Sequence, residues 1–114
     1  MARILLIEDD LDVCHVMEHA LIAGGHAVEA TGRVIAGFVL LGSHPFDLVV
    51  TDVRLPDGSG IEVADRARER GIPTLIVPKD DLIRFEFLLK PVRPSELLRA
   101  VERVLQAELT RPDP

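Results

Sequence analysis

The sequence of 114 residues predicts an α/β domain built on a mostly parallel β-sheet. Short apolar runs that end in acidic or turn-forming residues alternate with segments of helical periodicity, which is the pattern of repeated βαβ units. Apolar residues make up 47% of the chain, although it has four Phe and no Trp or Tyr. A core of Leu, Ile, Val and Ala suits helices packed on a parallel sheet. We expect one domain over residues 1–114.

The first half of the chain predicts three strands and two helices. Arg3–Ile7 is a near-continuous apolar run, as expected for a strand covered on both faces. Asp10 or Asp12 would cap the helix that follows, and Gly24 with Gly25 would end it. The other expected elements are a strand over Ala27–Ala30, a helix from about Arg33 to Leu41 ended by Gly42, and a buried strand over Asp47–Thr51.

The second half predicts a loop, two helices and two short strands. Val53–Gly60 holds Pro and two Gly among turn-forming residues, so we expect a loop. The last helix begins near Ser95, after Pro94, and has the clearest apolar stripe of the chain. The remaining elements are a helix over Ile61–Arg70 and strands over Thr74–Val77 and Phe85–Leu89.

The link between these last two strands is short, because only the seven residues 78–84 separate them. A parallel crossover with its helix needs at least about 10 to 12 residues. We therefore expect the helix at this place to be missing or reduced to a turn, which would leave part of one sheet face uncovered. Phe85, Phe87 and Leu89 share one face of the last strand, and an uncovered apolar face there would favour homodimerisation or partner docking.

Composition and charge exclude several functions. The net charge is −6 and the thirteen Lys and Arg are scattered, which argues against nucleic-acid binding. No segment reaches the roughly 18 apolar residues of a membrane span, and no leader pattern begins the chain. Cys14 is the only cysteine, so we expect a small core residue in a reducing compartment. These features predict a cytoplasmic protein whose end, residues 110–114, is frayed.

Charged residues follow three of the expected strands. Glu8, Asp9 and Asp10 come after the first strand, Asp52 after the third and Lys90 after the fifth. Because the carboxyl ends of parallel strands meet at one edge, these side chains should lie close together. Clustered carboxylates cannot all be ionised unless a cation or a proton offsets their repulsion, and Mg²⁺ is a cation that prefers such oxygen ligands. A carboxylate nucleophile, a divalent metal and a lysine together predict formation of an aspartyl phosphate.

Each of these residues also has an ordinary structural interpretation. The acids after the first strand resemble a helix cap, Asp52 a turn residue and Lys90 a solvated charge. His15 and His19 lie one helical turn apart but lack a third metal ligand, so we expect surface or semi-buried residues. The joint occurrence of acids and lysine at three strand ends favours the functional interpretation.

Three blocks of the sequence resemble the receiver domain of bacterial two-component response regulators. They are ILLIEDD at 4–10, DLVVTDVRLPDGSG at 47–60 and LLKP at 88–91, and the resemblance extends over essentially the whole chain. It implies a flavodoxin-like, doubly wound sheet of five parallel strands in the order 2-1-3-4-5. It also implies a response regulator that receives a phosphoryl group from a histidine kinase or phosphotransfer protein and signals through an unknown partner.

The resemblance assigns roles by position. Asp52 would be the phospho-acceptor, Lys90 would contact the phosphoryl group and Phe87 would occupy the aromatic switch position. Apart from phosphotransfer to itself and slow self-dephosphorylation, such a domain is not an enzyme. The magnesium ligands that it implies are the carboxylates of Glu8, Asp9 and Asp52 and the main-chain carbonyl of Arg54.

Two departures from the family pattern leave alternatives open, the short link at 78–84 and the residue at its first position. Pro78 stands where receivers carry Ser or Thr, and proline offers neither a hydroxyl nor an N–H to a phosphoryl group. A degenerate receiver that acts as a phosphorylation-independent interaction or dimerisation module is therefore the alternative. An aspartate-nucleophile phosphatase is disfavoured, because Arg54 stands where it would need a second acid.

Overall fold

The computed structural model describes residues 1–77 and 93–110, the last three by their backbone alone. Within this part of the chain the strands are β1 (Arg3–Ile7), β2 (Ala27–Thr31), β3 (Leu48–Thr51), β4 (Arg54–Leu55), β5 (Gly58–Ser59) and β6 (Thr74–Ile76). The helices of the same part are α1 (Leu11–Ala23), α2 (Val34–Ser43), α3 (Gly60–Glu69) and α4 (Pro94–Thr110).

The main sheet is parallel and runs in the order β2-β1-β3-β6. At its carboxyl edge Ile7 pairs with Thr31 on one side and with Thr51 on the other, and Thr51 pairs with Ile76. This order matches the first four strands of the predicted 2-1-3-4-5 sheet, so the predicted α/β class is confirmed. The expected strand Phe85–Leu89 and the link at 78–84 lie outside the described residues.

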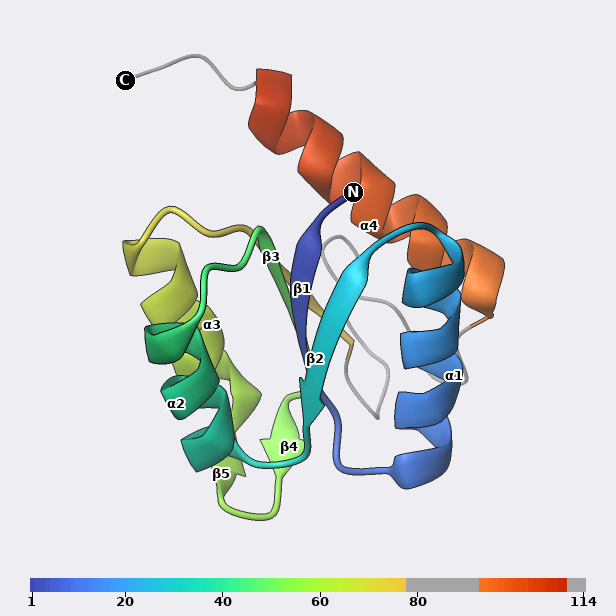
Figure 1. The fold of residues 1–114 in the computed structure, drawn as a ribbon. Coiled ribbons are helices and arrows are strands. Elements are labelled where there is room, and N and C mark those ends of the chain that lie inside the picture. Colours follow the sequence, from blue (N-terminus) through green and yellow to red (C-terminus); the bar gives the residue numbers. More distant parts are fainter. Residues whose placement is uncertain (78–92, 111–114) are drawn as a thin grey trace.

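Side chains of successive strand residues enter two separate cores. Ile4 and Leu6 of β1 face α1 and α4, whereas Leu5 and Ile7 face α2 and α3. All four side chains are fully buried, as the near-continuous apolar run predicted. Figure 1 shows the resulting layers, with α2 and α3 on one side of the sheet and α1 and α4 on the other.

Helix α1 begins and ends at residues that the sequence singled out. Of the two candidate caps, it is Asp10 that accepts hydrogen bonds from Asp12 N (3.0 Å) and Val13 N (3.1 Å). Gly24 ends the helix, as predicted. Cys14 lies in the core beneath the helix, where burial raises the pKa of its thiol, and this confirms its expected role as a small core residue.

Helix α2 continues beyond the predicted stop. Gly42 lies inside the helix, and an added Cβ there would meet nothing within 4 Å, so the position does not require glycine. The backbone becomes extended only at His44 (φ −135°). His44 precedes Pro45, and the residue before a proline is disfavoured in the helical region. The predicted end at Gly42 is therefore wrong, and Pro45 accounts for the observed end.

The segment predicted as a loop, residues 53–60, contains a small hairpin. Arg54 pairs with Ser59 and Leu55 with Gly58 in an antiparallel ladder, and Gly60 already begins α3. Gly58 has a φ of +148°, a conformation that side-chain-bearing residues rarely adopt. The prediction of irregular structure is thus corrected to a two-residue turn between two short strands.

No helix among the described residues is long and apolar enough to cross a membrane.

Two glycines provide a matched test of the close approach between the start of α3 and the end of β3. A Cβ at Gly60 would overlap the carbonyl oxygen of Asp52 and Oγ1 of Thr51, whereas a Cβ at Gly42 would enter open space. We expect Gly60→Ala to lower the free energy of unfolding by about 3 kcal/mol through overpacking. Gly42→Ala should leave it unchanged or raise it by up to about 1 kcal/mol, because alanine favours the helix. Urea unfolding of both variants measures the difference, and equal stabilities would contradict the proposed close approach.

Candidate metal and acceptor site

Three carboxylates meet at the carboxyl edge of the sheet. Glu8 and Asp9 follow β1, and Asp52 follows the adjacent strand β3. One possible ligand atom from each residue lies within 4.8 Å of the others. Glu8 and Asp52 are each only 2% exposed. The three residues that the sequence predicted at this edge therefore form one cluster.

Backbone hydrogen bonds continue past the strand ends and hold these residues in register. Asp52 N donates to Ile7 O at 2.9 Å, and Glu8 N donates to Thr31 O at 2.9 Å. The relative positions of the two acidic segments therefore follow from the pairing of β1 with its neighbours. Val77 N makes the equivalent bond to Thr51 O on the other side of β3.

The Asp52 carboxylate is oriented by the residue that follows it. Val53 N donates to Asp52 Oδ1 at 2.7 Å, a charge-assisted hydrogen bond. The carbonyl oxygen of Asp52 accepts a bond from Thr51 Oγ1 at 2.8 Å, and Gly60 N donates to Val53 O at 2.8 Å. The backbone on both sides of Asp52 is thus anchored, which fixes the direction of its side chain.

The donor atoms of this cluster fit a hard divalent cation. Carboxylate oxygens are the ligands that Mg²⁺ prefers, and it is commonly bound through one or two carboxylates together with retained water. Carboxylates this close together repel one another when ionised, so a cation favours the arrangement. Among the described residues, Glu8, Asp9 and Asp52 are the one group of three or more His, Cys, Asp or Glu close enough to hold a metal.

The other residues considered in the sequence have different positions. Asp10 caps α1 and is exposed, and Arg54 lies on β4 with an exposed side chain, two residues after the acceptor candidate. Lys90, Phe87 and Pro78 lie outside the described residues, so their expected roles stay predictions.

Sequence reasoning missed the role of the hairpin in holding helix ends. Ser59 accepts a bond from Ile61 N at 3.2 Å, and Glu62 accepts one from Ser59 N at 3.2 Å, which is a capping box. The spacing Ser-x-x-Glu carried this signal. Asp57 caps a different helix, since it accepts bonds from Val34 N (2.7 Å) and Ile35 N (3.0 Å) of α2.

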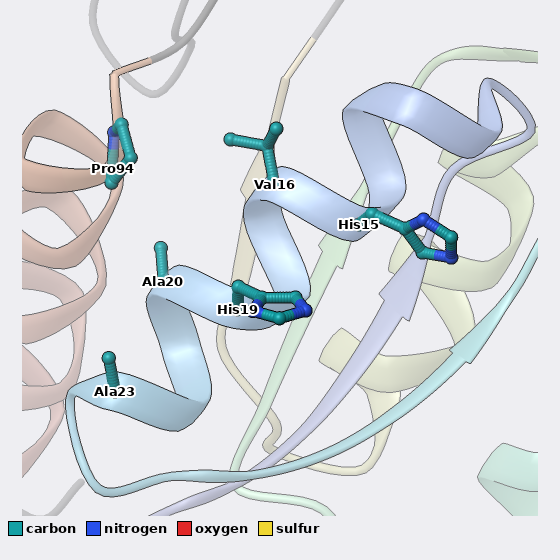
Figure 2. A pocket seen from close by; sticks show the side chains of 6 residues that line it. All are labelled: His15, Val16, His19, Ala20, Ala23 and Pro94. Carbon is teal, nitrogen blue, oxygen red and sulfur yellow. The ribbon is translucent and has the colours of Figure 1, made fainter.

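An open depression of about 520 Å³ lies between α1 and the start of α4, and Figure 2 shows the side chains that line it. The rings of His15 and His19 lie on the same side of α1, away from Pro94, and both residues are exposed. Among the described residues, the lining contains no carboxylate or thiol that would complete a metal site with them. Of the two expected positions for these histidines, surface or semi-buried, the structure shows the surface one. The lining residues are His15, Val16, His19, Ala20, Ala23 and Pro94.

A parallel sheet with helices on both faces and an acidic cluster at its carboxyl edge defines the class of the protein, an α/β domain with a candidate cation site. The chain matches the family described as "Response regulator receiver domain" over residues 4–102. It therefore belongs to the response regulator receiver domain family. Receiver domains are signalling domains that bind Mg²⁺ at an acidic cluster and interact with kinases or phosphotransfer proteins.

Curated relatives agree with this family. The response regulator receiver protein CpdR of Brucella abortus is 32% identical over 119 residues, covering 94% of this chain and 99% of CpdR. The transcriptional regulatory protein TctD of Salmonella typhimurium is 38% identical over 77 residues, covering 66% of this chain but 34% of TctD. The chain thus spans about a third of the length of TctD.

Solved structures show the same fold. The non-phosphorylated receiver domain of HemR from Leptospira biflexa is 32% identical, with a TM-score of 0.83 and full coverage of both chains. A CheY-like receiver domain protein from Methanospirillum hungatei has a TM-score of 0.85 over 96% of this chain and 97% of its own, at 23% identity. This second likeness supports the fold alone.

Acid should weaken the link between the hairpin and α2. The N–H groups of Ile35 and Val34 hold the pKa of Asp57 below its ordinary value of 3.8, and the charge of Arg33 adds to this. Asp57 therefore contributes stability above pH 3.8 that is lost as the pH falls through its lowered pKa. We expect the free energy of unfolding of the wild type to fall more steeply with decreasing pH in this range than that of Asp57→Asn. Parallel curves from urea titrations would contradict this.

Proposed function

We propose that this receiver domain accepts a phosphoryl group on Asp52 with the help of Mg²⁺. The observation that carries the proposal is the cluster of Glu8, Asp9 and Asp52 at the carboxyl edge of the sheet, with ligand atoms within 4.8 Å of one another. Membership of the receiver family supports it, since receiver domains bind Mg²⁺ at an acidic cluster. The donor would be a histidine kinase or a phosphotransfer protein, and the downstream partner is unknown.

The reaction is a nucleophilic substitution at phosphorus. A carboxylate oxygen of Asp52 forms a bond to the phosphorus, while the bond from phosphorus to the donor's imidazole nitrogen breaks and its electron pair remains on that nitrogen. The imidazole then takes up a proton if the pH requires it. The hydrogen bond from Val53 N to Asp52 Oδ1 fixes the carboxylate in one orientation, so that little conformational freedom is lost at the transition state.

The neighbouring acids would hold the metal ion. Glu8 and Asp9, together with Asp52 itself and the main-chain carbonyl of Arg54, are the proposed ligands. When bound, the cation supplies positive charge that offsets the charge of the carboxylates and of the incoming phosphoryl group. Lys90 is proposed to contact that group as a second positive charge, on the basis of its sequence position.

Phosphorylation can be tested without knowing the kinase. We expect incubation with acetyl phosphate or phosphoramidate and Mg²⁺ to add the mass of one phosphoryl group, and to add none to Asp52→Asn. The adduct should be labile in base, as expected of an acyl phosphate. An adduct of equal yield on Asp52→Asn would place the acceptor elsewhere.

Metal binding can be tested separately from phosphorylation. Mg²⁺ should raise the Tm of the wild type, because a ligand that binds only the folded state stabilises it. Asp9→Asn should reduce this increase strongly, since it removes one proposed ligand. The matched control Asp12→Asn removes an acid three residues away that caps nothing and lies outside the cluster. Equal Mg²⁺ responses in both variants would contradict the ligand assignment.

The alternative is a degenerate receiver that acts through contacts alone. One observation favours it, namely that Ile35 and Val39 of α2, one helical turn apart, are 68% and 62% exposed. Helix α2 also carries no charged residue, so this face is suited to a protein contact. Absence of any adduct with all donors, in a protein whose fold and Tm are intact, would favour this alternative over phospho-acceptance.

A further inference from the structure

Asp57 connects the segment after Asp52 to a helix that is remote in sequence. Its carboxylate accepts hydrogen bonds from Val34 N at 2.7 Å and from Ile35 N at 3.0 Å. Arg33, the residue at the N-cap of α2, makes no capping bond with its own side chain. The first N–H groups of α2 are therefore satisfied by the hairpin rather than by the residues that precede the helix.

The hairpin is also attached firmly to the acceptor candidate. Val53 N donates to the Asp52 side chain, and Gly60 N donates back to Val53 O at 2.8 Å. Between these points the ladder of β4 with β5 closes the segment on itself. A displacement of Asp57 would therefore move the backbone that contacts Asp52.

Packing beneath the hairpin strengthens this connection. Leu55 is 9% exposed and belongs to the core formed with α2 and α3. A Cβ added at Gly58 would lie 3.4 Å from Cγ2 of Val34, so the turn lies close against the first turn of α2. Ser59 of the same hairpin caps α3 as its own N-cap residue, so one segment of eight residues, 53–60, sets the positions of two helix starts and of the acceptor backbone.

We propose that Asp57 is a positioning residue for the acceptor site, which holds residues 53–59 in the arrangement that binds Mg²⁺ and accepts the phosphoryl group. This inference rests on the proposed function of Asp52. Asp57 touches neither the metal nor the phosphoryl group and acts through the main chain of Val53 and Arg54. By thermodynamic linkage, if the ordered hairpin raises the affinity for Mg²⁺, then bound Mg²⁺ stabilises the first turn of α2 by the same free energy.

Three variants separate positioning from general stability. Asp57→Ala removes both acceptors of the cap, and Asp57→Asn retains one carbonyl oxygen as the conservative variant. Arg70→Met is the matched control, because Arg70 Nη1 donates to Leu41 O at 3.0 Å near the opposite end of the same helix. The control loses a contact to α2 without touching the hairpin.

Two measurements report on the site without relying on activity. The first is the Mg²⁺ concentration for half-saturation, taken from the NMR shifts of the backbone amides of Val53 and Arg54. The second is hydrogen exchange at the amides of Val34 and Ile35, with and without Mg²⁺. Because the coupling cannot exceed the free energy of the cap, we expect Asp57→Ala to raise the half-saturation concentration about fivefold and Asp57→Asn to raise it less.

The outcomes distinguish the two proposals. A rise in Asp57→Ala but not in Arg70→Met, with slower exchange at Val34 and Ile35 when Mg²⁺ is added to the wild type, supports the positioning role. Equal half-saturation in all variants, in a protein whose wild type binds Mg²⁺ and forms the adduct, overturns the positioning role alone. A wild type that neither binds Mg²⁺ nor forms the adduct overturns the proposed function and this inference with it. If Asp57→Ala does not fold, Asp57→Asn decides by the same comparison with Arg70→Met.

Discussion

The parallel pairing of β1 with β3 is the constraint on which the site depends. Ile7 and Thr51 are partners at the last rung of the ladder, and Asp52 N extends it by donating to Ile7 O. A shift of one residue in this register would turn Asp52 to the opposite face of the sheet and expose the apolar side chains that precede it. The same apolar residues that stabilise the fold therefore bring the acids together. Pairing of the strands is enough to assemble the site.

The edge that carries these acids is also where helices begin. Asp10, Asp57 and Ser59 cap α1, α2 and α3 respectively, and each lies in a segment that follows the carboxyl end of β1 or β3. Helix starts present N–H groups and a partial positive charge, which is favourable near an acidic cluster. Figure 1 shows the starts of the three helices at the same end of the sheet. Segments that form the site thus also determine where the helices begin.

Local patterns were sufficient to predict the sheet and the acidic cluster. The strand Arg3–Ile7 was predicted with its observed bounds, because an apolar run buried on both faces is visible in the sequence itself. The positions of Glu8, Asp9 and Asp52 followed from the rule that parallel strands end at one edge. Burial of these acids and the register between strands needed the structure, since both depend on pairing between distant segments.

Of the features that sequence reasoning missed, one depends on long-range contacts and the others are local. The cap formed by Asp57 joins residues 22 and 23 positions apart, and a turn-forming aspartate gives no sign of such a partner. The predicted helix end at Gly42 was wrong, because glycine is favoured at a helix end where the backbone adopts a positive φ, and Gly42 does not adopt one. The capping box of Ser59 and Glu62 is local, and the spacing Ser-x-x-Glu would have been enough to predict it.

The opposite edge of the sheet shows how the scaffold keeps this arrangement rigid. Ala2 N donates to Nδ1 of the buried His26 at 3.1 Å. Nε2 lies 3.6 Å from Oε2 of Glu102 on α4. The start of β1 is therefore tied through one side chain to the start of β2 and placed beside the last helix. Strand β1 is thus held at its amino end by His26 and at its carboxyl end by β2 and β3. The sheet can therefore move little when the charge at Asp52 changes.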